Sequence, residues 1–173
     1  RYKHLYIIEP AFFHPSFCYA YRCLHWLGLG ARLHPMVRLT NKRRPIVDSK
    51  DEIFNTWRSR SQFSQLSDQS LRDFVDASFV LRDNCWHLRF NKQWEAAIYA
   101  SCCSLDMEIW QRFESISDKV TIIAAESSNT LFGITRRKLR TYQSLTFKTV
   151  PNTTHLLPFE CPDVLSRLIL PNT

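Results

Sequence analysis

The chain has 173 residues, of which 45% are hydrophobic and 13% aromatic, so it can bury a core and is not an intrinsically disordered chain. A formal net charge of +7 permits weak binding to nucleic acid, but no basic stripe with interleaved aromatic residues marks such an interface. No apolar run reaches the roughly 20 residues that a membrane span needs, and we expect neither a membrane span nor a cleavable signal peptide.

The first predicted element is a strand near the N-terminus. Leu5 to Ile8 form an apolar run that ends at Glu9-Pro10, which is typical of a strand buried on both faces of a parallel sheet. Glu9 would then lie at the carboxyl edge of the sheet, where ligands collect. The alternative is a surface carboxylate at the end of a strand.

Residues 11 to 90 predict a helical region rich in aromatic residues, among them Phe12 and Phe13. Its local signals are a capping box at Ser49–Glu52, a second helix start at Ser67-Asp68, and a turn at Asp83-Asn84 before a short strand or extended arm. Amphipathic helices with aromatic faces suit a cap that supplies the apolar wall of a cleft. Simple core packing is the alternative for any single aromatic residue.

The cysteines and histidines do not predict a metal site. Zinc usually takes four converging ligands in tight pairs, and Cys18, Cys23, His25 and His34 show no such pairing. We expect no metal and no cofactor. The six cysteines, which lack disulfide-framework spacing, are best explained as buried thiols in a reducing compartment, so we expect an intracellular, cytoplasmic protein.

Two further strands are predicted in residues 91 to 173. Val120 to Ala125 is a β-branched apolar run typical of a buried parallel strand, and a polar segment from Glu126 to Thr130 follows it. Leu145 to Val150 alternates and predicts a strand that Pro151-Asn152 should break. We expect both to pair with the N-terminal strand as parallel neighbours, connected by right-handed crossovers.

His155 stands on the loop that leaves the last predicted strand. Flanking elements can hold the backbone of such a residue while its imidazole turns toward a cleft, and its ordinary pKa suits a general base near neutral pH. The alternative is a loop histidine with no partner.

The motifs at the C-terminal end together resemble a known superfamily. Val150 to Pro162 reads V-P-x-x-x-H-L-x-P-x-E-x-P, and A-E-x-S-N follows the preceding buried strand. This combination resembles the C-terminal part of the α/β-hydrolase superfamily, in its lipase- and esterase-like branch with a helical cap. The resemblance implies an α/β fold of parallel strands with flanking helices, divided into a core strand (1–10), a cap or lid (11–90) and a C-terminal core (91–173).

The resemblance also implies roles for several residues. His155 takes the place of the catalytic base. The earlier junction usually reads G-E-x-S-D in the family, with the aspartate as the triad acid, so Asn129 takes the place of the acid, and Glu126 and Glu9 are alternative acids. An asparagine carries no charge to stabilise an imidazolium, and in the serine-protease template the amide costs about 10⁴ in turnover. The substrate would be bound near Glu9, Phe12 and Phe13.

The family's nucleophile is a serine in a G-x-S-x-G elbow, with an oxyanion hole beside it. This sequence has only Gly28, Gly30 and Gly133, and no serine lies between two glycines. We expect Cys102 and Cys103 to be packing residues on a helix and not a replacement nucleophile.

We therefore expect the C-terminal portion of a serine hydrolase that acts on a small hydrophobic or ester substrate, with the N-terminal half of the fold as its partner. The first alternative is an inactive hydrolase-like protein that binds a hydrophobic ligand or partner. The second is a nucleic-acid binder, which the absence of a basic, aromatic stripe disfavours.

Overall fold

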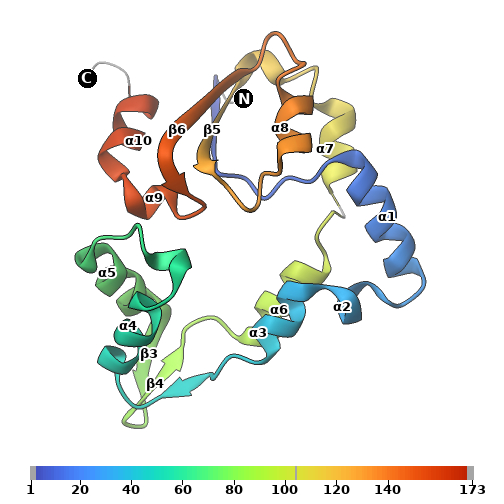
Figure 1. Ribbon diagram of the computed structural model, residues 1–173. Coiled ribbons are helices and arrows are strands. Elements are labelled where there is room, and N and C mark those ends of the chain that lie inside the picture. The colour runs from blue at the N-terminus through green and yellow to red at the C-terminus, as the bar shows by residue number, and fades with distance from the viewer. Residues whose placement is uncertain (1–2, 104, 171–173) are drawn as a thin grey trace. The chain divides into compact units, whose positions relative to one another are not determined.

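The computed structural model describes residues 3–103 and 105–170 and contains two compact units (Figure 1). Unit 1 consists of Arg1–Tyr19 and Cys103–Thr173, and unit 2 consists of Ala20–Cys102. Helix α1 (Pro15–Trp26) runs across the boundary between them. None of the helices in the described ranges is long and apolar enough to cross a lipid bilayer.

Unit 1 alternates strands and helices. Its elements besides α1 are β1 (Leu5–Ile8), α7 (Asp106–Arg112), the short 3₁₀ helix η2 (Ser117–Lys119), β5 (Val120–Ser127), α8 (Gly133–Leu139), β6 (Thr146–Thr154), α9 (Leu157–Glu160) and α10 (Pro162–Ile169). The strands form a parallel sheet in the order β1-β5-β6. Leu5 lies opposite Val120, and Thr121 lies opposite Thr146. The prediction of three neighbouring parallel strands is confirmed, so the segments that follow them meet at one edge of the sheet.

The central strand β5 is buried on both faces. Val120, Ile122 and Ala124 pack into one core cluster with residues of α7 and α8, whereas Ile123 and Ala125 pack into another with residues of α9 and α10. Figure 1 shows these two pairs of helices on opposite sides of the sheet. The alternation follows from the two-residue period of a strand, and each fully buried isoleucine contributes about 1.5–3 kcal/mol. This packing holds the ends of the strands in fixed positions.

Strand β6 continues through Pro151 and Asn152, so the predicted break at this point is wrong. The pairing of β5 with β6 shifts register here, and Asn152 has a φ of 54°. A proline is tolerated at such a bulge because the ladder donor that it lacks is not needed there. The Asn152 N–H instead donates to Oε2 of Glu126 at 2.9 Å. The strand ends at Thr154, directly before His155.

Unit 2 combines helices with a small antiparallel sheet of order β2-β4-β3. Its elements are α2 (Gly30–Leu33), α3 (Pro35–Asn41), β2 (Ile46–Val47), α4 (Lys50–Arg58), the 3₁₀ helix η1 (Ser61–Phe63), α5 (Asp68–Ser78), β3 (Phe79–Arg82), β4 (Cys85–Leu88) and α6 (Lys92–Ala100). Ser49 and Ser67 each accept a backbone N–H of the helix they precede, which confirms both predicted helix starts. Asp83 and Asn84 have φ values of 48° and 60°, as a tight hairpin turn requires.

Unit 2 covers a different range from the expected cap at residues 11–90. It begins at Ala20 and ends at Cys102, and it includes α6. Several of its large apolar side chains are exposed, among them Trp94, at 62%. In α6 the buried residue is the small Ala96, whereas the larger Trp94 is exposed. Helical spacing of apolar residues therefore does not by itself show which face of this helix is covered.

Candidate active site

Glu9 follows β1 directly and has an unusual backbone conformation. Its φ is 45°, in the left-handed region, which costs a residue other than glycine about 1–3 kcal/mol. Its N–H donates to the carbonyl oxygen of Ile123 at 2.8 Å, which extends the hydrogen bonding between β1 and β5 by one residue. The side chain of Glu9 is 2% exposed. Local strain of this kind persists only where surrounding contacts fix the residue.

Those contacts converge on the carboxylate of Glu9. The N–H of Ala125, in β5, donates to Oε2 at 2.6 Å, and the hydroxyl of Thr130 donates to Oε1 at 3.4 Å. Nδ1 of His155 lies 3.6 Å from Oε1. Burial by itself raises the pKa of Glu9, but hydrogen bonds from His155, Ser128 and the Ala125 backbone outweigh it, so the pKa lies below its ordinary value. Glu9 is therefore a buried carboxylate that stays ionised at neutral pH.

His155 is held at the end of β6 by its neighbours along the chain. Glu160 of α9 accepts hydrogen bonds from the backbone N–H of Thr154, at 2.7 Å, and from its hydroxyl. The hydroxyl oxygen of Thr154 in turn accepts the N–H of Leu156 at 3.3 Å. The imidazole is 42% exposed, so a molecule from outside can reach it.

Thr130 connects the histidine with the carboxylate. Its Oγ1 lies 3.0 Å from Nδ1 of His155. An ionised Glu9 can only accept, so the Thr130 hydroxyl donates to Glu9 and its oxygen accepts the Nδ1–H of His155. This arrangement assigns the proton of neutral His155 to Nδ1 and leaves the lone pair on Nε2. A histidine in this tautomer can accept a proton at Nε2.

The loop that carries Thr130 is fixed at both ends. Oγ of Ser128 accepts the N–H groups of Thr130 and Leu131, at 3.2 and 2.9 Å. Arg136 of α8 donates from Nη2 to the carbonyl oxygen of Ala125 and from Nε to that of Leu131, at 3.0 Å. The end of β5 and the start of α8 are thereby tied together around the loop.

Of the residues predicted for the site, some lie together at the sheet edge and others are exposed to solvent. His155 lies beside Glu9, which the sequence predicted as a substrate-binding residue and as one possible substitute for the acid. Asn129 and Glu126 are exposed, and Glu126 accepts the N–H of Asn152 at the bulge. Within residues 3–103 and 105–170, the hydrogen-bond and ion-pair partners of the His155 side chain are Thr130 and Glu9.

The two predicted substrate-binding aromatics pack within unit 1. Phe12 is 7% exposed and stacks on Trp110 at a ring distance of 4.3 Å, so it belongs to the core. Phe13 is half-buried and stacks on Phe17 at 5.1 Å. An aromatic residue just after a strand end gives the same sequence signal whether it packs inward or lines a cleft.

Sequence reasoning missed Thr130 and Glu160 as site residues. Thr130 directly follows Asn129 in the polar segment after β5, so its place at the sheet edge was available as a signal. Glu160 is the acidic residue of the motif after His155. What the sequence does not show is that its carboxylate turns back to Thr154.

Comparison with solved structures places this geometry in a known fold. The chain is similar to the peroxisomal α/β-hydrolase Lpx1 from Saccharomyces cerevisiae (TM-score 0.66, 16% identity, 97% of this chain and 44% of that one). It is also similar to the thioesterase domain from the curacin biosynthetic pathway (TM-score 0.64, 13% identity, 96% and 57%) and to an esterase of M. tuberculosis (TM-score 0.58, 16% identity, 96% and 52%). The chain spans about half the length of these structures. No protein-family model matches the sequence, and a comparison with curated proteins finds no significant match.

Proposed function

Because this chain has the fold of part of an α/β-hydrolase, we propose that it carries the acid–base pair of a serine hydrolase that cleaves ester or other acyl substrates. His155 is the general base, and Glu9 is the acid that orients it. The observation that carries the proposal is that Nδ1 of an accessible histidine lies beside a buried, ionised carboxylate, to which the Thr130 hydroxyl also links it. This is the arrangement that a base needs when its other nitrogen serves a nucleophile.

In the proposed mechanism, Nε2 of His155 takes the proton of a serine hydroxyl as that serine attacks the acyl carbon. The imidazolium that forms is stabilised by the charge of Glu9, which acts strongly because its carboxylate is shielded from water. The imidazolium then protonates the leaving group. The serine and the oxyanion donors belong to the part of the fold that the matched structures have beyond the aligned half, since no serine in this sequence lies between two glycines.

The assignment of Glu9 accounts for the asparagine at position 129. An amide there supplies no charge, but the buried carboxylate after β1 supplies it from the other neighbouring strand end. Glu126 supports the bulge in β6 through the Asn152 N–H and so helps to position the segment that leads to His155.

The proposal includes unit 2 as the cap. Unit 2 follows β1 in the chain and begins within α1, at Ala20. This is the place where the resemblance locates the family's cap. Such an insertion is suited to bind the apolar part of a small ester.

An inactive protein that binds a hydrophobic ligand is the alternative. It is favoured by an open groove within unit 2, of about 630 Å³, lined by Phe90, Trp94 and Ala97 together with Arg89, Asn91 and Gln93. The two large aromatic rings there are 61% and 62% exposed. A groove of this kind binds apolar groups without any contribution from His155.

The test compares the full-length protein with its His155→Ala variant on activated esters of increasing acyl length, with His25→Ala as a control at an exposed histidine. We expect His155→Ala to lower kcat/KM by about 10³-fold or more and the control to leave it unchanged. Equal rates for all three proteins would contradict the proposal. If the protein then still bound a fluorescent fatty acid, and Trp94→Ala abolished that binding, the alternative would be correct.

A further inference from the structure

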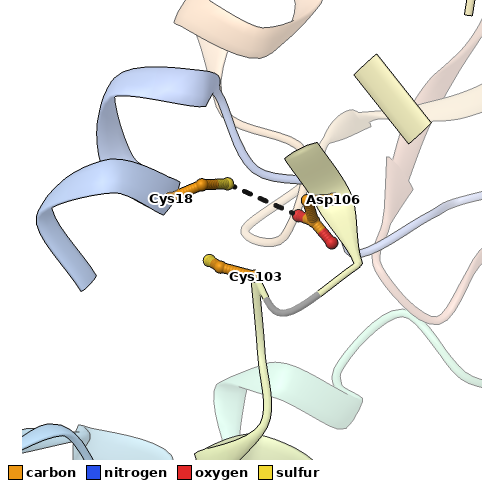
Figure 2. A group of neighbouring side chains, drawn as sticks. All are labelled: Cys18, Cys103 and Asp106. Carbon is orange, nitrogen blue, oxygen red and sulfur yellow. Dashed lines mark hydrogen bonds between the residues drawn. The ribbon is translucent and has the colours of Figure 1, made fainter. Parts of the chain in front are cut away.

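A second group of reactive side chains lies in unit 1 and is built from other elements than the Glu9–His155 pair. It consists of Cys18 in α1, Cys103, and Asp106 at the start of α7, as Figure 2 shows. One sulfur or oxygen atom from each of the three lies within 4.8 Å of the other two. The two thiols are buried, at 0% and 2% exposure.

The spacing of these atoms is close to what a tetrahedral zinc ion requires. Zn–S bonds of about 2.3 Å and Zn–O bonds of about 2.0–2.2 Å place neighbouring ligand atoms roughly 3.5–3.8 Å apart. Sγ of Cys18 already lies 3.8 Å from Oδ2 of Asp106. A contraction of at most about 1 Å would complete the geometry, and rotation of a cysteine side chain can supply it.

The surrounding structure holds the ligand atoms in place. Oδ2 of Asp106 accepts the N–H of Phe13 at 2.9 Å, and the carbonyl oxygen of Phe13 accepts the indole N–H of Trp110 at 2.7 Å. The thiol of Cys18 also points at that carbonyl, at 3.5 Å. Cys103 has a φ of 64°, a strained conformation of the kind that clusters at functional sites. Oriented ligands lose less entropy when a metal binds.

We propose that Cys18, Cys103 and Asp106 bind one Zn²⁺ ion, with a water molecule as the fourth ligand. Two thiolates favour this borderline-soft cation over Mg²⁺ and Ca²⁺, which require oxygen ligands. Binding is an exchange in which the two thiols release two protons and the sulfurs bind the metal, so no oxidant is needed and affinity falls as the pH is lowered. The inference does not rest on the proposed hydrolase function.

The position of the site suggests what the metal does. The chain leaves unit 1 after Tyr19 and returns to it at Cys103, so the ligands stand beside both crossing points. A metal bound there joins the two segments and closes the intervening chain into a loop, which stabilises unit 1 by mass action. The sequence predicts no metal at Cys18, Cys23, His25 and His34, which show no paired spacing, and it gives no sign that Cys18 meets Asp106, 88 positions away.

In the first experiment the full-length protein is reduced with a phosphine and stripped of metal. It is then titrated with Co²⁺, and the thiolate-to-cobalt charge-transfer absorption is followed. Zn²⁺ is added last to displace the cobalt. We expect one ion per chain. Cys18→Ser, Cys103→Ser and Asp106→Asn should each weaken binding by about 100-fold or more, since even the loss of an outer contact to a ligand costs about 10- to 100-fold. Cys23→Ser, at an exposed thiol of the same helix, should change nothing.

A second measurement uses the wild-type protein, so that the test does not depend on variants that fail to fold. Mass spectrometry follows the alkylation rates of the individual cysteines with and without Zn²⁺. The proposal requires Zn²⁺ to slow alkylation of Cys18 and Cys103 together, leave Cys23 unaffected, and raise the midpoint of thermal unfolding. It is overturned if Zn²⁺ changes neither rate, or if both thiols are lost without metal and regained with reductant, which would identify a disulfide instead.

Discussion

Replacing Glu9 by glutamine tests the acid–base pair most directly. The amide has almost the same size as the carboxylate, but it carries no charge. Its oxygen can still accept the N–H of Ala125, and its NH₂ group then faces the Thr130 hydroxyl and Nδ1–H of His155. The new amide donor is thereby placed against two groups that donate in the wild type, in a space where a carboxylate oxygen accepted. An unsatisfied buried group costs about 1–3 kcal/mol, so we expect the free energy of unfolding to fall by about 2 kcal/mol.

The same substitution should lower kcat by about 10³- to 10⁴-fold, because the imidazolium loses its negative partner and the Thr130 hydroxyl, which fixes the Nδ1–H tautomer, loses its acceptor. Glu126→Gln is the matched control. Its side chain is exposed, and an amide oxygen can accept the Asn152 N–H equally well, so its effect on stability should stay below about 0.5 kcal/mol.

Urea unfolding gives the global free energy, and hydrogen exchange of the Ala125 amide reports locally on its bond to Glu9. Steady-state kinetics on an activated ester give kcat. If Glu9→Gln and Glu126→Gln behave alike in unfolding free energy, in Ala125 exchange and in kcat, then the carboxylate of Glu9 has neither the structural nor the catalytic weight assigned to it.

The pH dependence gives an independent check on Glu9. Its pKa in the folded protein lies below the ordinary value of 4.5, since hydrogen bonds from His155, Ser128 and Ala125 outweigh the effect of burial. The unfolded chain therefore takes up this proton at higher pH than the folded one. The stabilisation is fully present above pH 4.5 and is lost as the pH falls through the folded pKa. Below pH 4.5, stability should decline less steeply in Glu9→Gln than in the wild type, and parallel curves would contradict this.

Two further substitutions test the surroundings of the pair. Thr130→Val removes the hydroxyl between His155 and Glu9 and should lower kcat by about fivefold, because one hydrogen bond contributes about 1 kcal/mol. Thr130→Ser should keep most of the activity, and a fully active valine variant would exclude the link. Arg136→Ala should lower the free energy of unfolding by about 1–3 kcal/mol, because the carbonyl groups of Ala125 and Leu131 lose their donor. Its exposed neighbour is the control: Arg137→Ala should stay within about 0.5 kcal/mol in urea unfolding, and equal effects would contradict the role of Arg136.

The parts of the fold that were predictable are those with a local cause. An apolar, β-branched run such as Val120 to Ala125 can be buried on both faces only inside a covered parallel sheet, and the structure buries it there. Ser49 and Ser67 each cap a helix because a hydroxyl can accept an N–H close by in the chain. Such features need no knowledge of distant residues.

The parts that were not predictable depend on contacts between distant residues or on a local irregularity. Glu9 and Thr130 are 121 positions apart, and only the register of β1 against β5 brings them together. The bulge at Asn152 depends on a carboxylate of the neighbouring strand, so Pro151 by itself suggested a strand end. Glu9 has a positive φ, and its carboxylate accepts the N–H of Ala125. Glutamate rarely adopts such a φ, so the sequence gives no sign of it.

Asn129→Asp decides between the family pattern and the geometry of this chain. By the pattern, residue 129 is the acid, and a restored carboxylate should raise kcat by a factor approaching 10⁴. The geometry favours another result, because Asn129 is exposed while the next side chain, Thr130, contacts the imidazole, and Glu9 already supplies a buried charge.

We therefore expect Asn129→Asp to change kcat by less than about threefold in the wild type, as exposed substitutions usually do. In the Glu9→Gln background it should restore little, since a solvated carboxylate stabilises an imidazolium weakly. The kinetics of the two single variants and of the double variant on one activated ester provide the measurement. A rise of more than about tenfold on Asn129→Asp alone, well beyond the expected range, would assign the acid to position 129 and leave Glu9 with a structural role.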